Sequence, residues 1–390
     1  MFLNNMRFWI LISFVTVSGF SQGMLLPLLA IILEQNGVSS SMNGLHATGL
    51  YIGVLIASPF MEKPLQKLGY KPIILIGGFL VFSSLFVFPI WQALWFWFVL
   101  RLLIGIGDHM LHFATQTWIT STAAPEQRGR IIAFYGLFFS LGFSIGPVMT
   151  RLLAIHESLP FIVSAVFCLI IWVLMLFIRN EHINTNEGVE MIEVSSSIGR
   201  FIKTGKIAWV ALLSPFAYGL LESTLHGIFP VYGLRIGHDV GLLSLVIPLF
   251  SLASLITQIP LGILSDKIGR KKMLLIIISL GIVIFAIGAQ VEHSVIGLFI
   301  TFALSGMLVG SLYSLGISYM ADLLPKSLLP AGNIMCGIAF SIGSITGPYL
   351  GGLFIDWFPN TSFFYIIVIL LVLVVIAIGS KKETGDTMSV

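Results

Sequence analysis

The chain of 390 residues is 57% hydrophobic and only 9% charged, and its mean hydropathy is +1.02. This balance excludes a water-soluble globular protein, so most of the surface must face lipid. The net charge of +3 indicates no nucleic-acid partner. The two cysteines, Cys168 and Cys336, lie inside apolar runs and indicate neither a disulfide nor a metal site.

Apolar runs of about 20 residues, the length of a helix that crosses a bilayer core, follow one another along the chain. The first is longer than a signal-peptide core and lacks a small-x-small cleavage site before Glu34, so we expect an uncleaved helix. The predicted spans are 8–33, 43–61, 72–90, 94–120, 131–154, 159–178, 207–233, 240–264, 273–291, 295–321, 332–355 and 362–379. The sequence therefore predicts an all-α integral membrane protein with twelve transmembrane helices.

Three regions follow from these spans. We expect residues 1–179 to form an N-terminal six-helix bundle and residues 207–390 to form a second bundle with a short tail. Residues 180–206 are polar, and we interpret them as a solvated cytoplasmic linker. Basic residues mark the cytoplasmic side, and the opposite loops hold only Arg151 and Arg235. We therefore expect a multi-pass protein with both termini in the cytoplasm.

A charged loop follows the eighth predicted span and reads G-I-L-S-D-K-I-G-R-K-K at residues 262–272. It resembles the loop motif G-x-L-x-D-R-x-G-R-K of the major facilitator superfamily, which joins the second and third helices of a six-helix half. An eroded copy, E-K-P-L-Q-K-L-G-Y-K-P, occupies residues 62–72. A second string, G-x3-S-x-G-x3-G-P, occurs from Gly136 and again from Gly337. The two pairs predict two pseudo-symmetric bundles, as in the major facilitator fold.

The resemblance also implies a cytoplasmic gate, because in the family the acid of this loop pairs with charged neighbours and closes that side. The gate residues predicted in this way are Gly262, Asp266, Gly269, Arg270 and Asp322. The matching places in the first half hold Gln66, Tyr70 and either Ser121 or Thr122. We therefore expect the second half to hold the gate, with neutral hydrogen bonds and Arg128 and Arg130 from the first half.

The fourth span carries ionisable residues, which are costly in a membrane and so are candidates for function. Arg101, Asp108 and His112 recur at helical spacing and share one face, which must line a cavity or contact another helix. The string R-x-x-x-G-x-G from Arg101 resembles the fourth-helix motif of proton-coupled members of the superfamily. By that resemblance Arg101 would be the arginine implicated in proton coupling, and we expect it to bias the protonation of Asp108 and Glu222. The alternative is an arginine that only holds the bundle together.

The seventh span places Tyr218, Glu222 and His226 nearly on one face. Glu222 is either a titratable site or a neutral acid that bonds to His226 or Tyr218. The predicted proton-coupling residues are Asp108, Arg101 and Glu222. The predicted substrate cavity comprises His112, Gln22, Tyr218, His226, Tyr135 and Tyr313.

Two glycine–proline pairs, Gly146–Pro147 and Gly347–Pro348, are predicted to bend the fifth and eleventh spans. The string that ends in Gly146–Pro147 resembles the core of an antiporter motif but lacks its trailing Gly-Gly, and helix packing explains the glycines equally well. The match to G-x-S-x-G at Gly142 lies within a span, with no strand before it and no partner acid and histidine. It does not indicate a hydrolase, and we expect no enzyme activity.

The chain resembles secondary transporters of the drug/proton antiporter branch of the superfamily. We therefore expect it in the cell membrane, specifically a bacterial plasma membrane. The first hypothesis is proton-driven efflux of a lipophilic or cationic small molecule by alternating access. The alternatives are proton-linked transport of a specific metabolite, anion or lipid-linked solute, and a membrane sensor without transport. We expect no metal and no cofactor, a proton gradient as the energy source, and a monomer whose partners are substrate, protons and lipid.

Overall fold

The computed structural model describes residues 6–123, 128–182 and 194–381, and all regular secondary structure in these ranges is helical. Helices suit these apolar runs because they satisfy every backbone polar group within the segment. Ten helices of the described residues are long and apolar enough to cross a membrane. The shorter apolar helix 364–380 and the broken helix 40–60 correspond to the two other predicted spans. The predicted fold class is confirmed.

The helices are, in chain order, α1 (Met6–Gln35), α2 (Ser40–Ala47), α3 (Gly49–Ala57), α4 (Glu62–Leu68), α5 (Tyr70–Val87), α6 (Leu94–Ser121), α7 (Arg128–Ile145), α8 (Leu159–Leu176), α9 (Val194–Gly227), α10 (Phe229–Arg235), α11 (Val240–Ile268), α12 (Arg270–Val291), α13 (Val295–Val309), α14 (Leu312–Leu323), α15 (Leu329–Trp357) and α16 (Phe364–Ser380). Short 3-10 segments cover Ser58–Phe60, Phe88–Ile90, Gly146–Ala154 and Lys326–Leu328.

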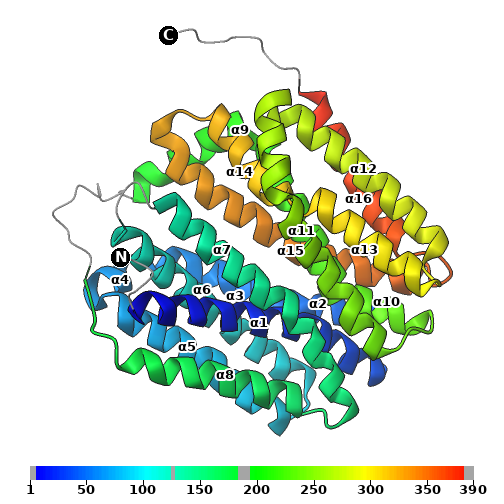
Figure 1. The fold of residues 1–390 in the computed structure, drawn as a ribbon, viewed down its shortest axis with the longest axis horizontal. Helices are drawn as coiled ribbons and strands as arrows, with labels where there is room; N and C mark the ends of the chain where they lie inside the picture. The colour runs from blue at the N-terminus through cyan, green and yellow to red at the C-terminus, as the bar shows by residue number, and fades with distance from the viewer. Residues whose placement is uncertain (1–5, 124–127, 183–193, 382–390) are drawn as a thin grey trace. The chain divides into compact units, whose positions relative to one another are not determined.

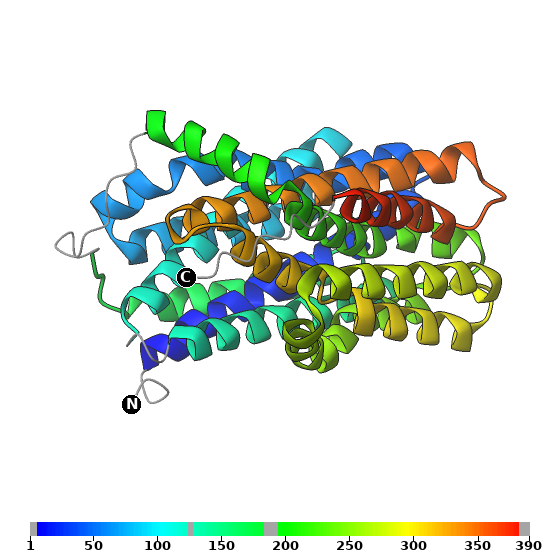
Figure 2. The ribbon, with the colours of Figure 1, turned by 90° about the horizontal axis from the view of Figure 1, so that it is seen from above.

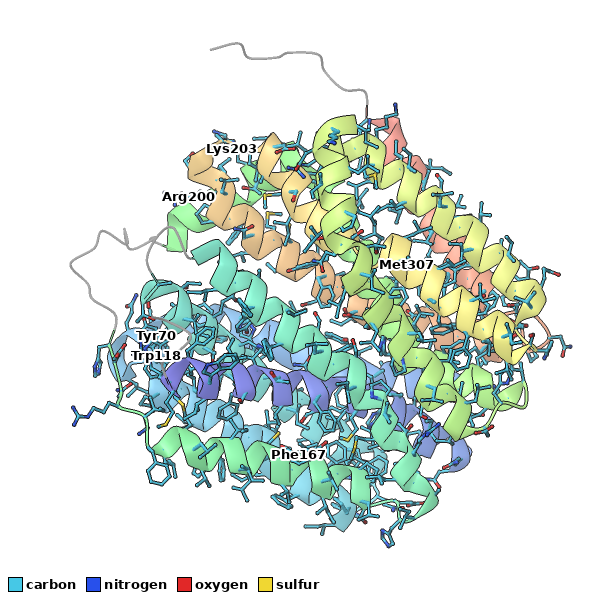
Figure 3. All side chains as sticks on the ribbon, in the orientation of Figure 1. Tyr70, Trp118, Phe167, Arg200, Lys203 and Met307 are labelled. Atoms are coloured by element: carbon cyan, nitrogen blue, oxygen red, sulfur yellow. The ribbon has the colours of Figure 1, made fainter. Side chains whose placement is uncertain are left out.

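Some elements differ from the predicted spans. The second span is divided at Thr48, whose hydroxyl donates to the Leu45 carbonyl at 2.6 Å and so competes with the helical hydrogen bonds. The tenth span is divided at Gly310 into α13 and α14. Helix α9 begins at Val194 within the predicted linker, where exposed Arg200 and Lys203 (Figure 3) hid the helix from a search for apolar runs.

The chain forms two compact units. The first contains the described residues up to 182 together with Glu222–Leu252 and Ser344–Pro359; the second contains the rest. In the first unit α1 packs along α7 (Figure 1), and α5 packs against both α6 and α8. In the second unit α12 packs against α13 and α16 (Figure 2). We call the end of the first unit at Gly69 the loop end and the end at Gly37 and Gly237 the far end.

Glycines bring α1 and α7 into backbone contact. A Cβ atom at Gly142 would lie 2.0 Å from the Thr16 carbonyl oxygen, and one at Gly23 would lie 2.0 Å from that of Phe143. The duplicated string repeats this arrangement in the second unit, where a Cβ at Gly343 would lie 2.0 Å from the Phe216 carbonyl oxygen. The shared glycines therefore serve close helix packing.

The two glycine–proline pairs have different surroundings. At Gly146 the α-helix gives way to the 3-10 segment Gly146–Ala154, which contains Pro147. Helix α15 runs through Gly347 and Pro348 without interruption. The change of helical winding is thus found in the first half.

Candidate functional site

A chain of polar side chains crosses the first unit at the midpoint of α6. The Ser18 hydroxyl donates to Asp108 Oδ1 at 2.6 Å and lies 2.9 Å from His112 Nε2, while His112 Nδ1 bonds to the Tyr135 hydroxyl. Because Ser18 donates to Asp108, it must accept from His112 Nε2–H, and His112 Nδ1 then accepts from Tyr135. Assigned in this way, every donor in the chain points toward Asp108.

Asp108 is 1% exposed, and its second carboxyl oxygen, Oδ2, has no hydrogen-bond partner of ordinary geometry. Gln22 also lies near the carboxyl group, but it forms no hydrogen bond with Oδ2. Within the described residues Asp108 forms no ion pair. The site therefore holds a buried acid whose second oxygen can still accept a hydrogen bond or a proton.

Arg101 binds elsewhere. Its Nη1 lies 3.1 Å from His46 Nδ1, and its Nη2 donates to the Leu25 carbonyl at 3.1 Å. His46 in turn donates from Nε2 to the Leu94 carbonyl at 3.2 Å. The structure does not bring Arg101 to Asp108, because seven residues separate them and a helix rises roughly 10 Å over that stretch. The guanidinium, which is 0% exposed, instead ties α6 to α1 and α2.

Tyr51 of α3 is a residue that the sequence analysis missed. It is buried, the charges of both Arg101 and Glu222 act on its phenol, and Ser344 lies within hydrogen-bonding reach. Tyr51 is therefore close enough to both ionisable groups to feel their charges. The only sequence signal was a single tyrosine in an apolar span.

His226 is fully buried in the first unit. Its Nδ1 lies 2.8 Å from the backbone carbonyl oxygen of Glu222, and its Nε2 lies 3.4 Å from Ser251 Oγ. The ring packs against Phe143, with centroids 4.9 Å apart. The hydrogen bond between His226 and Glu222 thus involves the Glu222 backbone carbonyl and not the carboxyl group that the sequence suggested as its partner.

Tyr218 and Tyr313 belong to the second unit, in which their ring centroids are 6.2 Å apart. Both rings also pack against Phe340. The residues predicted to line a substrate cavity therefore divide between the units: His112, Gln22, His226 and Tyr135 lie in the first, and Tyr218 and Tyr313 in the second.

The second unit brings the predicted gate charges together. Arg270 lies 2.7 Å from Asp266 and 2.6 Å from Asp322, and its Nη1 donates to Ser265 Oγ at 3.2 Å. Gly269 allows the preceding turn with a φ of +92°. A Cβ at Gly262 would meet no atom within 4 Å. The side chains of Arg128 and Arg130, also named for this gate, lie outside the described residues.

The far end of the first unit joins helices from both halves of the sequence. Arg235 of α10 donates to both carboxyl oxygens of Glu34 in α1, at 2.7 and 3.1 Å, and lies 3.6 Å from Asp356 of α15. Asp356 also accepts from the backbone amides of Ser40 and Ser41 at the start of α2. The hydrogen bond with Glu34 raises the pKa of Arg235, so the guanidinium stays charged.

A second arginine at the far end also contacts a helix from the other half of the sequence. Arg151 donates from Nε to Ser244 Oγ of α11 at 2.9 Å. At the matching place in α15 stands Gly352, where a Cβ would lie 2.2 Å from the Ser40 carbonyl oxygen. Both arginines predicted to face outward thus bind between the halves of the sequence.

Comparison with known proteins identifies the family. The sequence profile of the Major Facilitator Superfamily matches residues 11–247 and 211–385. The chain belongs to the major facilitator superfamily. Among superfamily relatives, the uncharacterized MFS-type transporter YfkF of Bacillus subtilis is 51% identical over 93% of this chain and 92% of its own. Multidrug resistance protein 2 of Bacillus subtilis is 24% identical over 90% of this chain and 88% of its own.

Solved structures of the superfamily share the fold at low sequence identity. A mutant form of the nucleoside transporter NupG superposes with a TM-score of 0.81 at 12% identity, over 95% of this chain and 98% of its own. A bacterial homolog of the human lysosomal transporter Spinster gives a TM-score of 0.74 at 14% identity, over 95% of each chain. As a superfamily member with these apolar helices, the protein is a multi-pass membrane transporter and not an enzyme.

Proposed function

We propose that the protein is a proton-coupled exporter of lipophilic or cationic small molecules, which works by alternating access between bundles 1–179 and 207–390. The observation that carries this proposal is the buried Asp108 carboxyl, with a free oxygen at the end of a directed hydrogen-bond chain. An ionised carboxylate without a cation is costly in a membrane, so proton uptake or cation binding is the cheapest way to neutralise it. Glu222 is the second titratable acid of this scheme.

The proposal places the protein in a bacterial plasma membrane with both termini in the cytoplasm. The loop end then faces the cytoplasm. It assigns Arg101 to holding α6 against its neighbours, because the guanidinium is fully buried and bound to His46 and Leu25. An anionic substrate at Arg101 would have to displace these contacts. The resemblance to multidrug resistance protein 2 supports export of drug-like molecules.

Ethidium accumulation in cells tests this function. Cells that express the protein are expected to accumulate less ethidium than cells with an empty vector, and a protonophore should remove the difference. Export that persists with the protonophore would contradict proton coupling. Equal accumulation in both strains would contradict cation export. In proteoliposomes that contain the wild-type protein, ethidium added outside should enter the lumen in exchange for protons that leave it. A sensor would instead bind the dye without moving protons.

The far end should respond to reversal of one charge. Arg235→Glu would place a third acid beside Glu34 and Asp356, and their repulsion should favour an open far end over a closed one. We expect the free-energy difference between the two states to change by about 1 kcal/mol or less, because the ion pair is only partly buried. Spin labels at the exposed residues Met42 and Phe358, in a background without the two native cysteines, would report a larger distance. The Glu34→Arg/Arg235→Glu pair should recover part of the short distance. The same reversal at exposed Arg200 should leave it unchanged, and a distance insensitive to Arg235 would refute the assignment.

A further inference from the structure

At the loop end of the first unit, neutral residues stand at the positions that match the charged gate residues of the second unit. There, Arg270 binds Asp266 and Asp322. In the first half Tyr70 stands at the place of Arg270, and its hydroxyl lies 3.1 Å from Ser121 Oγ at the end of α6. The connection between loop and helix end is therefore kept as a neutral hydrogen bond.

An acid from a distant part of the sequence occupies this end. Glu181, which follows α8, forms an ion pair with Arg7 and accepts a 2.8 Å hydrogen bond from Trp118 Nε1. Its backbone carbonyl accepts a 3.1 Å hydrogen bond from the Tyr70 amide. This one residue joins the start of α1, the end of α6 and the loop that precedes α5.

Asn180 adds to the same attachment. Its Oδ1 accepts from the Lys71 amide at 3.0 Å, and its Nδ2 donates to the Leu68 carbonyl at 2.9 Å. The two bonds bracket Gly69, which has a φ of +80°. A Cβ at Gly69 would lie 2.6 Å from the Glu181 carbonyl oxygen, so the close approach requires glycine.

Aromatic side chains complete the cluster. Trp118 is 0% exposed and stacks on Tyr70 with ring centroids 5.3 Å apart; the two residues lie together at the loop end (Figure 3). The Arg7 guanidinium lies 5.4 Å from the centroid of the Trp118 ring, a cation–π distance. The charge of Arg7 is therefore balanced by both a carboxylate and a ring face.

We propose that Glu181 is the positioning acid of the first inner loop, supplied in place of the acid that the loop motif lost at Gln66. It holds α1, the loop before α5, the end of α6 and the start of the central segment as one body. The bundle can then turn during transport without deforming its cytoplasmic end. The segment that connects the bundles is thus attached to the first unit as far as Glu181, although Asn180 itself is exposed. This inference goes beyond the proposed function, because it requires only transport and not a particular substrate.

Hydrogen exchange in lipid nanodiscs tests the attachment directly. Glu181→Ala removes both side-chain contacts and is expected to speed exchange of the Tyr70 and Lys71 amides about 5- to 30-fold. Glu181→Gln, which can still accept from Trp118, should give a smaller increase. The matched control is Glu157→Gln, which changes an exposed acid whose partner is Gln92. If exchange at Tyr70 and Lys71 is the same in Glu181→Ala and Glu157→Gln, the proposal is overturned.

Ethidium export kinetics separate positioning from binding. Glu181→Ala should lower the maximal rate several-fold and leave KM unchanged, because the residue lies at the loop end and not beside Asp108. Arg7→Glu should be slower than the Arg7→Glu/Glu181→Arg pair, in which opposite charges face each other again. A raised KM with an unchanged maximal rate would overturn the positioning role. The exchange measurement needs no substrate, so failure of ethidium export alone would count against the proposed function and not against this attachment.

Discussion

Asp108→Asn is expected to abolish proton-driven export while leaving the protein folded in the membrane. The amide has the shape of the acid and can still accept a hydrogen bond from Ser18, so the packing of α1 on α6 should persist. It cannot take up and release a proton, so a pH gradient can no longer drive net transport. The measurement is ethidium export from proteoliposomes under an imposed pH gradient. Ethidium counterflow, which needs no net proton movement, should be retained.

The matched control for this variant is Asp239→Asn. Asp239 lies at the far end and accepts from the Leu242 amide at 3.0 Å, at the start of α11. Asparagine caps a helix about as well as aspartate, so this variant should export normally. Full proton-driven export by Asp108→Asn would show that the coupling acid lies elsewhere. Glu222→Gln would then be the next variant to measure.

Gly142→Ala is expected to destabilise the protein by roughly 3 kcal/mol, because the new methyl group would overlap the backbone of α1. Its Cβ would lie 2.0 Å from the Thr16 carbonyl oxygen, and backbone atoms in packed helices cannot move aside cheaply. The matched control lies in the same helix: a Cβ at Gly136 would meet no atom within 4 Å. Since alanine favours helix over glycine by about 1 kcal/mol, Gly136→Ala should be neutral or stabilising.

Thermal unfolding of the purified variants in detergent tests these expectations. The melting temperature should fall for Gly142→Ala and should stay the same or rise for Gly136→Ala. The internal repeat supplies a second test, because Gly343 and Gly337 have the same two environments in the second unit. Gly343→Ala should therefore destabilise, and Gly337→Ala should not. Equal melting temperatures for Gly142→Ala and Gly136→Ala would show that the α1–α7 contact does not limit stability.

The sequence predicted the fold because the loop motif and its eroded copy identify the family and its duplication. Helical spacing also placed Asp108 and His112 on one face of α6, as found. It could not supply their partners, because Ser18 and Tyr135 come from other helices and hydropathy does not define helix rotation. Spacing likewise grouped Arg101 with Asp108, although about two helical turns keep their side chains apart.

The contacts made by residues between helices were the hardest to foresee. Glu181 was visible only as one acid at the start of a polar segment, and no periodicity links it to Arg7 or Trp118. Arg235 was noted only as an exception to the distribution of positive charge. Both residues acquire their partners from segments far away in sequence, which a single chain without related sequences does not reveal.

The hydrogen-bond chain from Tyr135 to Asp108 has a direction, and that direction sets a rule for the proposed cycle. A proton that enters at the Tyr135 hydroxyl displaces one proton from each group to the next, so every donor then points away from Asp108. The chain cannot deliver a second proton until the two hydroxyls and the imidazole have returned to their first orientation. In the proposed cycle the chain would therefore pass one proton and would have to be reset before each further turnover.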